Sequence, residues 1–223
     1  MSKKVLHHYD DNHVPVSAKQ IVPLIMELVN PNSVIDVGCG LAQWLKVFSL
    51  NGVETILGID GNHVSSDMIY IDKNNFQYFD LERSFDLKIS SKFDLVVSLE
   101  VAEHISENNA DEYVKLLSSL GDRILFSAAI PFQTGENHVN EQNHIYWQEK
   151  FLKHDFLMLD IIRPTIWNNN NINWWYRQNM FLLVKKNDSI FNKELIFNGN
   201  QLIHPELLKM YVDLNLDLQN LLK

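Results

Sequence analysis

An apolar segment runs straight into a glycine-rich turn early in this chain of 223 residues. Residues 34–40 read Val-Ile-Asp-Val-Gly-Cys-Gly, and a helical pattern over residues 41–50 follows them. Glycines at such a turn let the backbone approach a ligand closely. Neither the three-glycine dinucleotide fingerprint nor the phosphate-binding Gly-Lys-Ser/Thr pattern is present at this turn. The turn therefore indicates a ligand-binding loop in an α/β protein without defining the ligand.

Apolar segments and helical patterns alternate along the chain. We expect strands at residues 33–37, 55–59, 75–79, 93–98 and 123–129, and an antiparallel pair at 156–161 and 180–184. We expect helices at residues 17–29, 41–50, 110–120 and 146–154. Strands rich in Val, Ile and Leu that alternate with helices are typical of a parallel sheet covered on both faces. Ligands of such sheets bind at the carboxyl ends of the strands.

The chain divides into three parts in this interpretation. Residues 1–16 are a polar arm or a flap over a ligand, residues 17–186 form the main domain, and residues 187–223 are a helical extension. Apolar residues of the extension step by four and three, a heptad seam. The seam consists of Leu207, Tyr211, Leu214, Leu218 and Leu221. It packs either on its own domain or in a homodimer, and two heptads are too few to decide.

Charge and cysteine content exclude several classes of function. The formal net charge of −9 disfavours nucleic acid and anionic membranes as main partners, because both attract basic proteins. No apolar run approaches the roughly 20 residues of a membrane span, so we expect no membrane insertion. A single cysteine and an N-terminus unlike a signal peptide favour the cytoplasm.

Acidic residues follow two further predicted strands. Asp60 lies about 20 residues after the glycine turn, where a carboxylate can accept hydrogen bonds from ribose hydroxyls. Asp80 follows the next strand and can accept a hydrogen bond from an exocyclic adenine amine. The fourth strand ends at Ser98, beside the same predicted pocket. Together these strand ends predict a nucleoside-containing cofactor.

With the Asp-Val-Gly-Cys-Gly turn, Asp60, Asp80 and residues 93–100 in this order, residues 17–185 resemble the class I S-adenosylmethionine-dependent methyltransferases. The resemblance implies a Rossmann-like seven-stranded sheet, mostly parallel with the last strand antiparallel, helices on both faces and an extra C-terminal helix. It implies S-adenosylmethionine as cofactor, with the methionine part, the ribose and the adenine bound by successive strand ends. The implied cofactor-binding residues are Asp36, Gly38 and Gly40 for the methionine part, Asp60 for the ribose, and Asp80 and Leu81 for the adenine. Ser98 and Cys39 also line the implied cofactor site, Cys39 as a small turn residue.

A cluster of acidic residues and histidine follows the fourth strand, over the expected position of the transferable methyl group. Glu100, Glu103 and His104 stand at i, i+3 and i+4, so they share one face if a helical turn begins here. Such a cluster is costly unless a cation lies within it, and its donors suit Mg²⁺ or Mn²⁺. The alternative is a Glu-His pair that supports the loop or acts as a base without metal. Downstream, either His138 or His144 offers a fourth ligand.

The Glu-x-x-Glu-His pattern with a later histidine resembles two groups of metal-dependent O-methyltransferases. One methylates the 2′-hydroxyl of small RNAs, and the other belongs to the ubiquinone pathway. In both, the metal engages neighbouring hydroxyls of the acceptor. His144, three residues before Trp147, looks nearest to the later histidine of the RNA enzymes, with His138 as the rival. The resemblance implies that Glu103 takes part in catalysis and that His104 or His144 accepts the proton if it is not a ligand.

The segments at residues 129–142, 146–151 and 174–179 are similar to methyltransferases of glycan and surface-polysaccharide assembly. The implied acceptor is a hydroxyl of a sugar in a glycan or nucleotide-sugar. Trp147 and Trp175 would stack on sugar faces, and Asn140 and Arg177 would bind hydroxyls. Three alternatives stay open: an RNA 2′-hydroxyl, a quinone or catechol, for which the polar loop at 133–143 is a poor lid, and a cofactor-binding scaffold without enzymatic activity.

Overall fold

The structure is a computed structural model that describes residues 15–61, 64–65, 67–81, 83, 85–190 and 192–221. Within residues 216–221 only the backbone is described. The predicted arm at residues 1–16 therefore lies almost wholly outside the described residues. No helix in the described ranges combines the length and the hydropathy that a membrane span requires.

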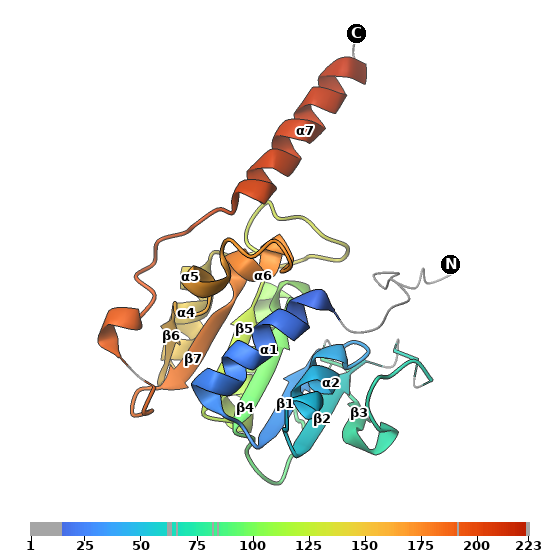
Figure 1. Ribbon diagram of the computed structural model, residues 1–223, viewed down its shortest axis with the longest axis vertical. Helices are drawn as coiled ribbons and strands as arrows, with labels where there is room; N and C mark the ends of the chain where they lie inside the picture. The colour runs from blue at the N-terminus through green and yellow to red at the C-terminus, as the bar shows by residue number, and fades with distance from the viewer. Residues whose placement is uncertain are drawn as a thin grey trace.

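A single seven-stranded sheet forms the centre of the molecule (Figure 1). Its strand order is β3-β2-β1-β4-β5-β7-β6. All neighbouring strands pair in parallel except that β7 runs antiparallel to both β5 and β6. The strands are β1 (Ser33–Val37), β2 (Thr55–Asp60), β3 (Phe76–Tyr78), β4 (Leu95–Leu99), β5 (Arg123–Ser127), β6 (Phe156–Leu159) and β7 (Phe181–Lys185). The expected Rossmann-like sheet with an antiparallel last strand is confirmed.

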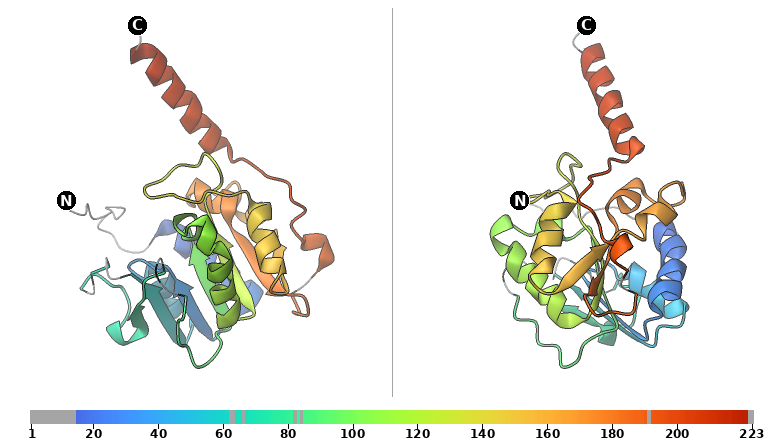
Figure 2. Two further views of the ribbon diagram at one scale, coloured as in Figure 1. Left: turned by 180° about the vertical axis from the view of Figure 1, so that it is seen from behind. Right: turned by 90° about the vertical axis from the view of Figure 1, so that its left-hand side faces the viewer.

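Helices cover both faces of the sheet, as Figure 2 shows from behind and from the side. The α-helices are α1 (Val16–Val29), α2 (Gln43–Leu50), α3 (Ala110–Leu120), α4 (His144–Leu152), α5 (Arg163–Ile166), α6 (Trp174–Asn179) and α7 (Pro205–Leu221). Buried side chains of α1 and α2 belong to one hydrophobic cluster, and those of α3 and α4 belong to a second. Strand residues alternate between the clusters, because successive side chains of a strand point to opposite faces. In β4, Leu95 and Val97 belong to the first cluster and Val96 to the second.

Two helices and one strand begin or end at other residues than the sequence predicts. We expected a helix from residue 41, but α2 begins at Gln43 because Ala42 adopts a left-handed conformation with φ 60°. The third strand was expected at residues 75–79 and is limited to β3, since a short 3₁₀ turn (Lys73–Asn75) precedes it. Helix α4 begins at His144, two residues earlier than expected, because Asn143 is the extended residue before it. This early start brings His144 into the helix.

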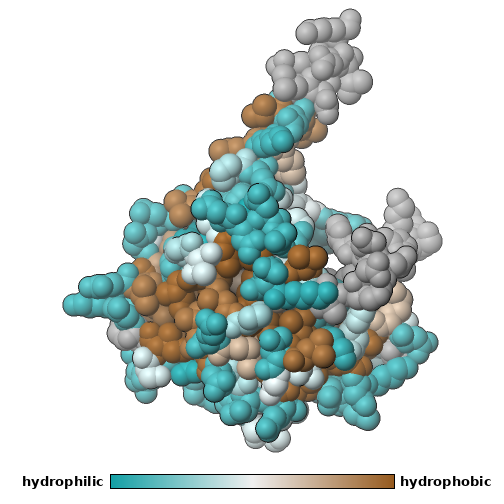
Figure 3. All heavy atoms as spheres, in the orientation of Figure 1, coloured by the Kyte–Doolittle hydropathy of each residue, from teal (hydrophilic) through white to brown (hydrophobic). Residues whose placement is uncertain are grey.

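The C-terminal helix α7 projects from the body (Figure 1). Leu207 in its first turn is buried, and the Tyr211 hydroxyl donates a hydrogen bond to the Phe132 carbonyl oxygen. Farther along, Leu208, Val212 and Leu214 are exposed, and hydrophobic side chains lie beside hydrophilic ones on this part of the helix (Figure 3). The side chains of Leu218 and Leu221 lie outside the described residues. Among the seam residues whose side chains are described, Leu207 and Tyr211 contact the domain and Leu214 is exposed, so a homodimer through α7 stays a prediction.

Trp147 is part of the core between the sheet and α4. Its side chain is fully buried, with its ring centroid 5.7 Å from that of Phe126 and 5.0 Å from that of Tyr146. We expect Trp147→Ala to lower the free energy of unfolding by about 3–5 kcal/mol, because it removes a large buried side chain. Urea denaturation measures this loss. Trp175→Ala, at a half-buried ring, is the matched control, and equal losses in the two variants would contradict the core assignment.

Candidate active site

The glycine turn after β1 has a backbone that only glycine adopts easily. Gly38 has φ 84° and Gly40 has φ 54°, both in the left-handed region. A Cβ on Gly38 would lie 2.4 Å from a methyl carbon of Val101, so no side chain fits there. The Gly38 amide donates to the Ile59 carbonyl oxygen at 2.8 Å, which ties the turn to the end of β2. The turn is thus fixed at the carboxyl edge of the sheet.

Two buried carboxylates flank this turn. Burial, and then the negative charge of Asp60, raise the pKa of Asp36 well above its usual value. The Asp60 carboxylate accepts hydrogen bonds from the amides of Gly40 and Gly61, each at 2.6 Å. Two acidic groups this close favour a ligand that brings positive charge.

The other predicted cofactor residues lie in different environments. Asp80 is exposed and forms an ion pair with Arg83 at 3.3 Å, and Leu81 is partly buried against the second cluster. The Ser98 hydroxyl lies 2.6 Å from the Tyr113 hydroxyl in a buried hydrogen bond toward α3. Burial raises the pKa of the Cys39 thiol, so this residue is a protonated small turn residue.

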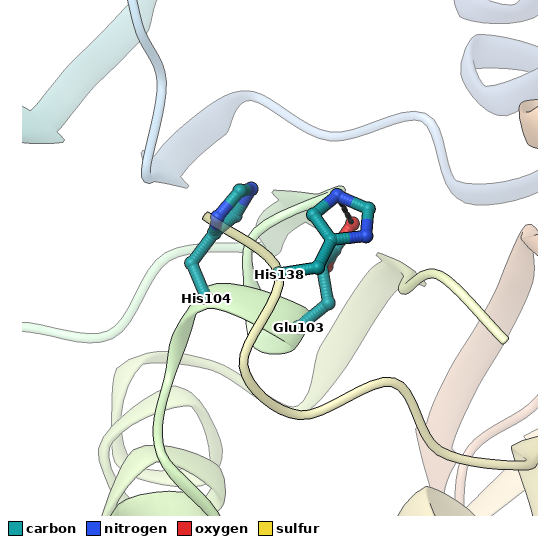
Figure 4. Close-up of side chains that lie close together, drawn as sticks. All are labelled: Glu103, His104 and His138. Carbon is teal, nitrogen blue, oxygen red and sulfur yellow. Dashed lines mark ion pairs between the residues drawn. The ribbon is translucent and has the colours of Figure 1, made fainter. Parts of the chain in front are cut away.

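Glu103, His104 and His138 form the one group of potential metal ligands that the described residues contain. Glu103 and His104 lie on a 3₁₀ turn after β4 (Ala102–His104), and His138 comes from the loop after β5. One donor atom from each residue lies within 4.8 Å of the others. In Figure 4 the His138 ring lies over the Glu103 carboxylate, and the two imidazoles have centroids 5.0 Å apart. The fold thus brings two segments distant in sequence to one point.

Glu103 is the most constrained group of this cluster. Its side chain is completely buried, and neither carboxylate oxygen has a hydrogen-bond partner of normal geometry among the described residues. The ring of His138 lies beside it, with Nε2 at 3.9 Å from Oε1. Burial, and then the charge of Glu100, raise the pKa of Glu103 well above its usual value, and contacts with the backbone amides of Glu103 and Ala129 oppose this shift only in part. A bound cation would compensate a buried carboxylate of this kind.

Glu100 does not lie on a common helical face with Glu103 and His104, contrary to the sequence expectation. Its backbone is left-handed, with φ 55°, and the 3₁₀ turn begins only at Ala102. Its carboxylate accepts hydrogen bonds from the side-chain amides of Gln133 at 3.0 Å and Asn179 at 3.4 Å. Burial raises the pKa of Glu100, and hydrogen bonding to the Ser127 hydroxyl, followed by the two amides, partly opposes the shift. Glu100 thus belongs to an amide network next to the cluster.

His144 also lies apart from the cluster. Its ring is buried at the start of α4, with its centroid 4.8 Å from that of Phe181. Its Nε2 lies 3.3 Å from Oδ1 of Asn179. Burial, and then the positive charge of Arg163, lower the pKa of His144 to about 3. Of the two downstream histidines, the structure places His138 beside Glu103 and leaves His144 as a neutral ring in the interior.

The predicted acceptor-binding residues are mostly engaged within the protein. Trp147 is in the core, and buried Arg177 pairs with Glu206 of α7 and donates to the Trp167 carbonyl oxygen. Asn140 is buried, its backbone amide donates to the Glu103 carbonyl oxygen at 3.0 Å, and its side-chain oxygen accepts a hydrogen bond from Gln142 at 2.9 Å. Trp175 remains half-buried beside its aromatic neighbours.

Sequence reasoning missed the polar residues that surround the cluster. Gln133, Gln178 and Asn179 link to one another and to Glu100 through side-chain amides. Glu141 pairs with His138 at 2.7 Å. The spacing of Glu141 three residues after His138 was the only signal for this pair, because the amide network joins residues about 45 positions apart.

The chain belongs to the family described as "Methyltransferase domain", whose model matches residues 11–179. This match and the fold confirm the predicted methyltransferase of class I. A search of curated proteins finds no match to the chain.

Solved methyltransferase structures share the fold at low sequence identity. An O-methyltransferase family protein from Burkholderia thailandensis is 12% identical with a TM-score of 0.53, over 75% of this chain and 56% of that one. Magnesium protoporphyrin IX methyltransferase from Synechocystis PCC 6803, with bound SAH, is 16% identical with a TM-score of 0.53, over 75% and 81%. Human N-acetylserotonin methyltransferase, in complex with SAM, is 12% identical with a TM-score of 0.52, over 76% and 52%. This chain thus matches little more than half the length of the first and third proteins.

The buried neutral state of His144 predicts an acid-sensitive contribution to stability. In the unfolded chain this histidine binds a proton below its ordinary pKa of 6.5, whereas the folded protein excludes the proton until about pH 3. Stability is therefore lost as pH falls through this interval, by at most about 1.4 kcal/mol per pH unit. His144→Gln keeps an amide donor for Asn179 and should flatten the pH dependence of unfolding measured in urea. His154→Gln, at a partly exposed position, is the control, and parallel curves for wild type and His144→Gln would refute the assignment.

Proposed function

We propose that this protein is an S-adenosylmethionine-dependent O-methyltransferase that methylates a hydroxyl of a sugar, in a glycan or a nucleotide-sugar, with the help of a divalent metal ion. The observation that carries the metal dependence is the buried Glu103 carboxylate, to which no described side chain donates a hydrogen bond, next to His104 and His138. The family match and the fold support methyl transfer.

The residues at the ends of β1 and β2 fit a cationic cofactor. Asp36 and Asp60 are buried acidic groups at the glycine turn, and their mutual repulsion favours a ligand with positive charge. Gly38 and Gly40 keep the turn free of side chains. When bound, S-adenosylmethionine supplies a methyl group on a sulfonium centre. Asp36 would hold the methionine part, Asp60 the ribose and Asp80 with Leu81 the adenine.

The donor set fits a divalent ion. A carboxylate and two imidazoles suit Mn²⁺ and neighbouring transition metals, and Mn²⁺ is therefore a better first probe than Mg²⁺, which prefers oxygen ligands. When bound, the ion supplies a Lewis acid for an acceptor hydroxyl. Glu103, His104 and His138 would hold it. Asn137 accepts a hydrogen bond at 3.2 Å from Nδ1 of His104, and this contact orients the ring and favours its Nε2 as the ligand or proton acceptor.

A sugar acceptor is supported by the residue types around the cluster. Gln133, Gln178 and Asn179 form an amide network, and amides can bind hydroxyls in both directions. Trp175 is half-buried and can present a ring to the apolar face of a sugar.

An aromatic hydroxyl, as in a catechol or a reduced quinone, is the second candidate acceptor. We expected the loop at residues 133–143 to be too polar for such a substrate. However, Phe132 and Val139 beside and within this loop are 77% and 64% exposed, which favours an acceptor with an apolar part.

Methyl transfer to defined acceptors tests these candidates. The protein is incubated with S-adenosylmethionine and a deoxyhexose glycoside, a catechol or a short RNA, and release of S-adenosylhomocysteine is measured. We expect transfer to the glycoside that stops on chelation and returns with Mn²⁺. Full activity after rigorous chelation would refute the metal role, transfer to catechol alone would favour the second candidate, and cofactor binding without turnover would favour a scaffold.

Glu103→Gln separates metal chemistry from cofactor binding. The variant keeps the shape of the side chain but loses its charge, and removal of a buried charge leaves the fold stable. Activity should fall by at least about 100-fold, because even residues behind a ligand change metal affinity by roughly 10–100-fold. Affinity for S-adenosylmethionine, measured by calorimetry, should stay unchanged. The exposed Glu107→Gln is the matched control, and a fully active Glu103→Gln variant would contradict the proposal.

A further inference from the structure

Two residues outside the proposed set of metal ligands, Glu141 and Gly135, contact the ring of His138. Oε1 of Glu141 lies 2.7 Å from Nδ1 of this ring, and the ring occupies the space that a Cβ on Gly135 would need. The side chains of His138 and Glu141 are 13% and 17% exposed, so the contact is largely shielded from water.

Glu141 is itself held in place. Its second oxygen, Oε2, accepts a hydrogen bond at 2.9 Å from the backbone amide of Phe132. Phe132 has a left-handed backbone, with φ 71°, and its carbonyl oxygen accepts the hydrogen bond from Tyr211 of α7. The Glu141 carboxylate therefore bridges the start of the loop to the ring of His138.

The contact with Glu141 determines which ring nitrogen of His138 carries the proton. An ionised carboxylate accepts hydrogen bonds only, so Nδ1 of His138 is the protonated nitrogen of the neutral ring. Nε2 is then the nitrogen with the lone pair. It lies 3.9 Å from Oε1 of Glu103, too far for a direct hydrogen bond. The lone pair is thus on the side of the ring that lies near the buried carboxylate.

The absence of a side chain at residue 135 sets the position of the ring. A Cβ on Gly135 would lie 2.2 Å from Nε2 and 2.3 Å from Cε1 of His138. Because these distances are far below van der Waals contact, any larger residue would displace the ring. Gly135 thus leaves the space in which Nε2 lies, and the contact with Glu141 favours the tautomer with the proton on Nδ1.

We propose that Glu141 is a positioning residue that, with Gly135 as the space for the ring, presents Nε2 of His138 to a divalent cation bound by Glu103 and His104. This inference rests on the proposed metal-dependent function. Glu141 is also linked to the C-terminal helix, because Phe132 donates to its carboxylate and accepts a hydrogen bond from Tyr211 of α7. Helix α7 thus helps to hold the loop that carries His138.

The tautomer of His138 is the direct test. In protein labelled with ¹⁵N-histidine, ¹H–¹⁵N NMR at about pH 8.5, above the usual histidine pKa, distinguishes the two neutral tautomers. His138→Gln assigns the signal. We expect wild type without metal to show the Nδ1–H tautomer, Glu141→Ala to lose this preference, and Glu141→Asp to restore part of it. An unchanged tautomer in Glu141→Ala would overturn the assignment.

Titration with Mn²⁺ tests the consequence. Glu141→Ala should weaken Mn²⁺ binding by about 10–100-fold, as expected for a carboxylate behind a metal-bound histidine. Gly135→Ala should weaken it without loss of the Nδ1–H tautomer. Glu136→Gln, at an exposed residue of the same loop, is the control and should bind as wild type does. Thermal unfolding of each variant checks that the fold is retained.

The outcomes separate this inference from the proposed function. If wild type binds no Mn²⁺, the metal-dependent function fails, and with it the role of Glu141 toward a cation, whatever the tautomer. If wild type binds Mn²⁺ and Glu141→Ala binds it equally well, the proposed function stands and the positioning role of Glu141 is refuted.

Discussion

Buried negative charge at the carboxyl edge of the sheet is the constraint on which the site depends. Asp36 and Asp60 lie together at one point of this edge, and Glu103 lies at another with Glu100 near it. Carboxylates out of water are costly unless cations or hydrogen-bond donors compensate them. Asp60 and Glu100 accept well-formed hydrogen bonds in the protein, whereas no described side chain donates a hydrogen bond to Glu103. Hydrogen bonds within the protein therefore compensate Asp60 and Glu100, whereas Glu103 is suited to bind a ligand.

The sheet brings these groups together because its parallel strands all end at the same edge. The core on both faces is apolar and closely packed, so the strand ends are rigid supports for the loops. The loop after β5 then crosses to the end of β4, where the backbone amides of Val139 and Asn140 donate to the Glu103 carbonyl oxygen. These two hydrogen bonds hold His138 over Glu103. The cluster of Glu103, His104 and His138 thus depends on one loop, which is added to a sheet that other methyltransferases share.

Much of the fold was predictable because each strand and helix has a local pattern. The strands around the glycine turn and the acidic strand ends followed from apolar runs, glycines and spacing. Glu103 and His104 were predictable as a pair because adjacent residues on one short turn stay together in any fold. Glu100 was assigned to the wrong face, since a helical turn was expected at a residue whose backbone is left-handed. The resemblance favoured His144 over His138 as the downstream ligand, because local spacing does not show which residue of the loop folds back over Glu103.

The sequence by itself determined the sheet, the family and which strands are followed by functional residues. All three depend on short-range patterns of apolar and small residues. Only the tertiary structure decided which histidine meets Glu103 and which becomes part of the interior. The physical reason is that helix α4 begins at His144 and buries it against Phe181, while the preceding loop remains free to fold back over β4. Contacts of this kind join residues far apart in the chain, and no local pattern records them.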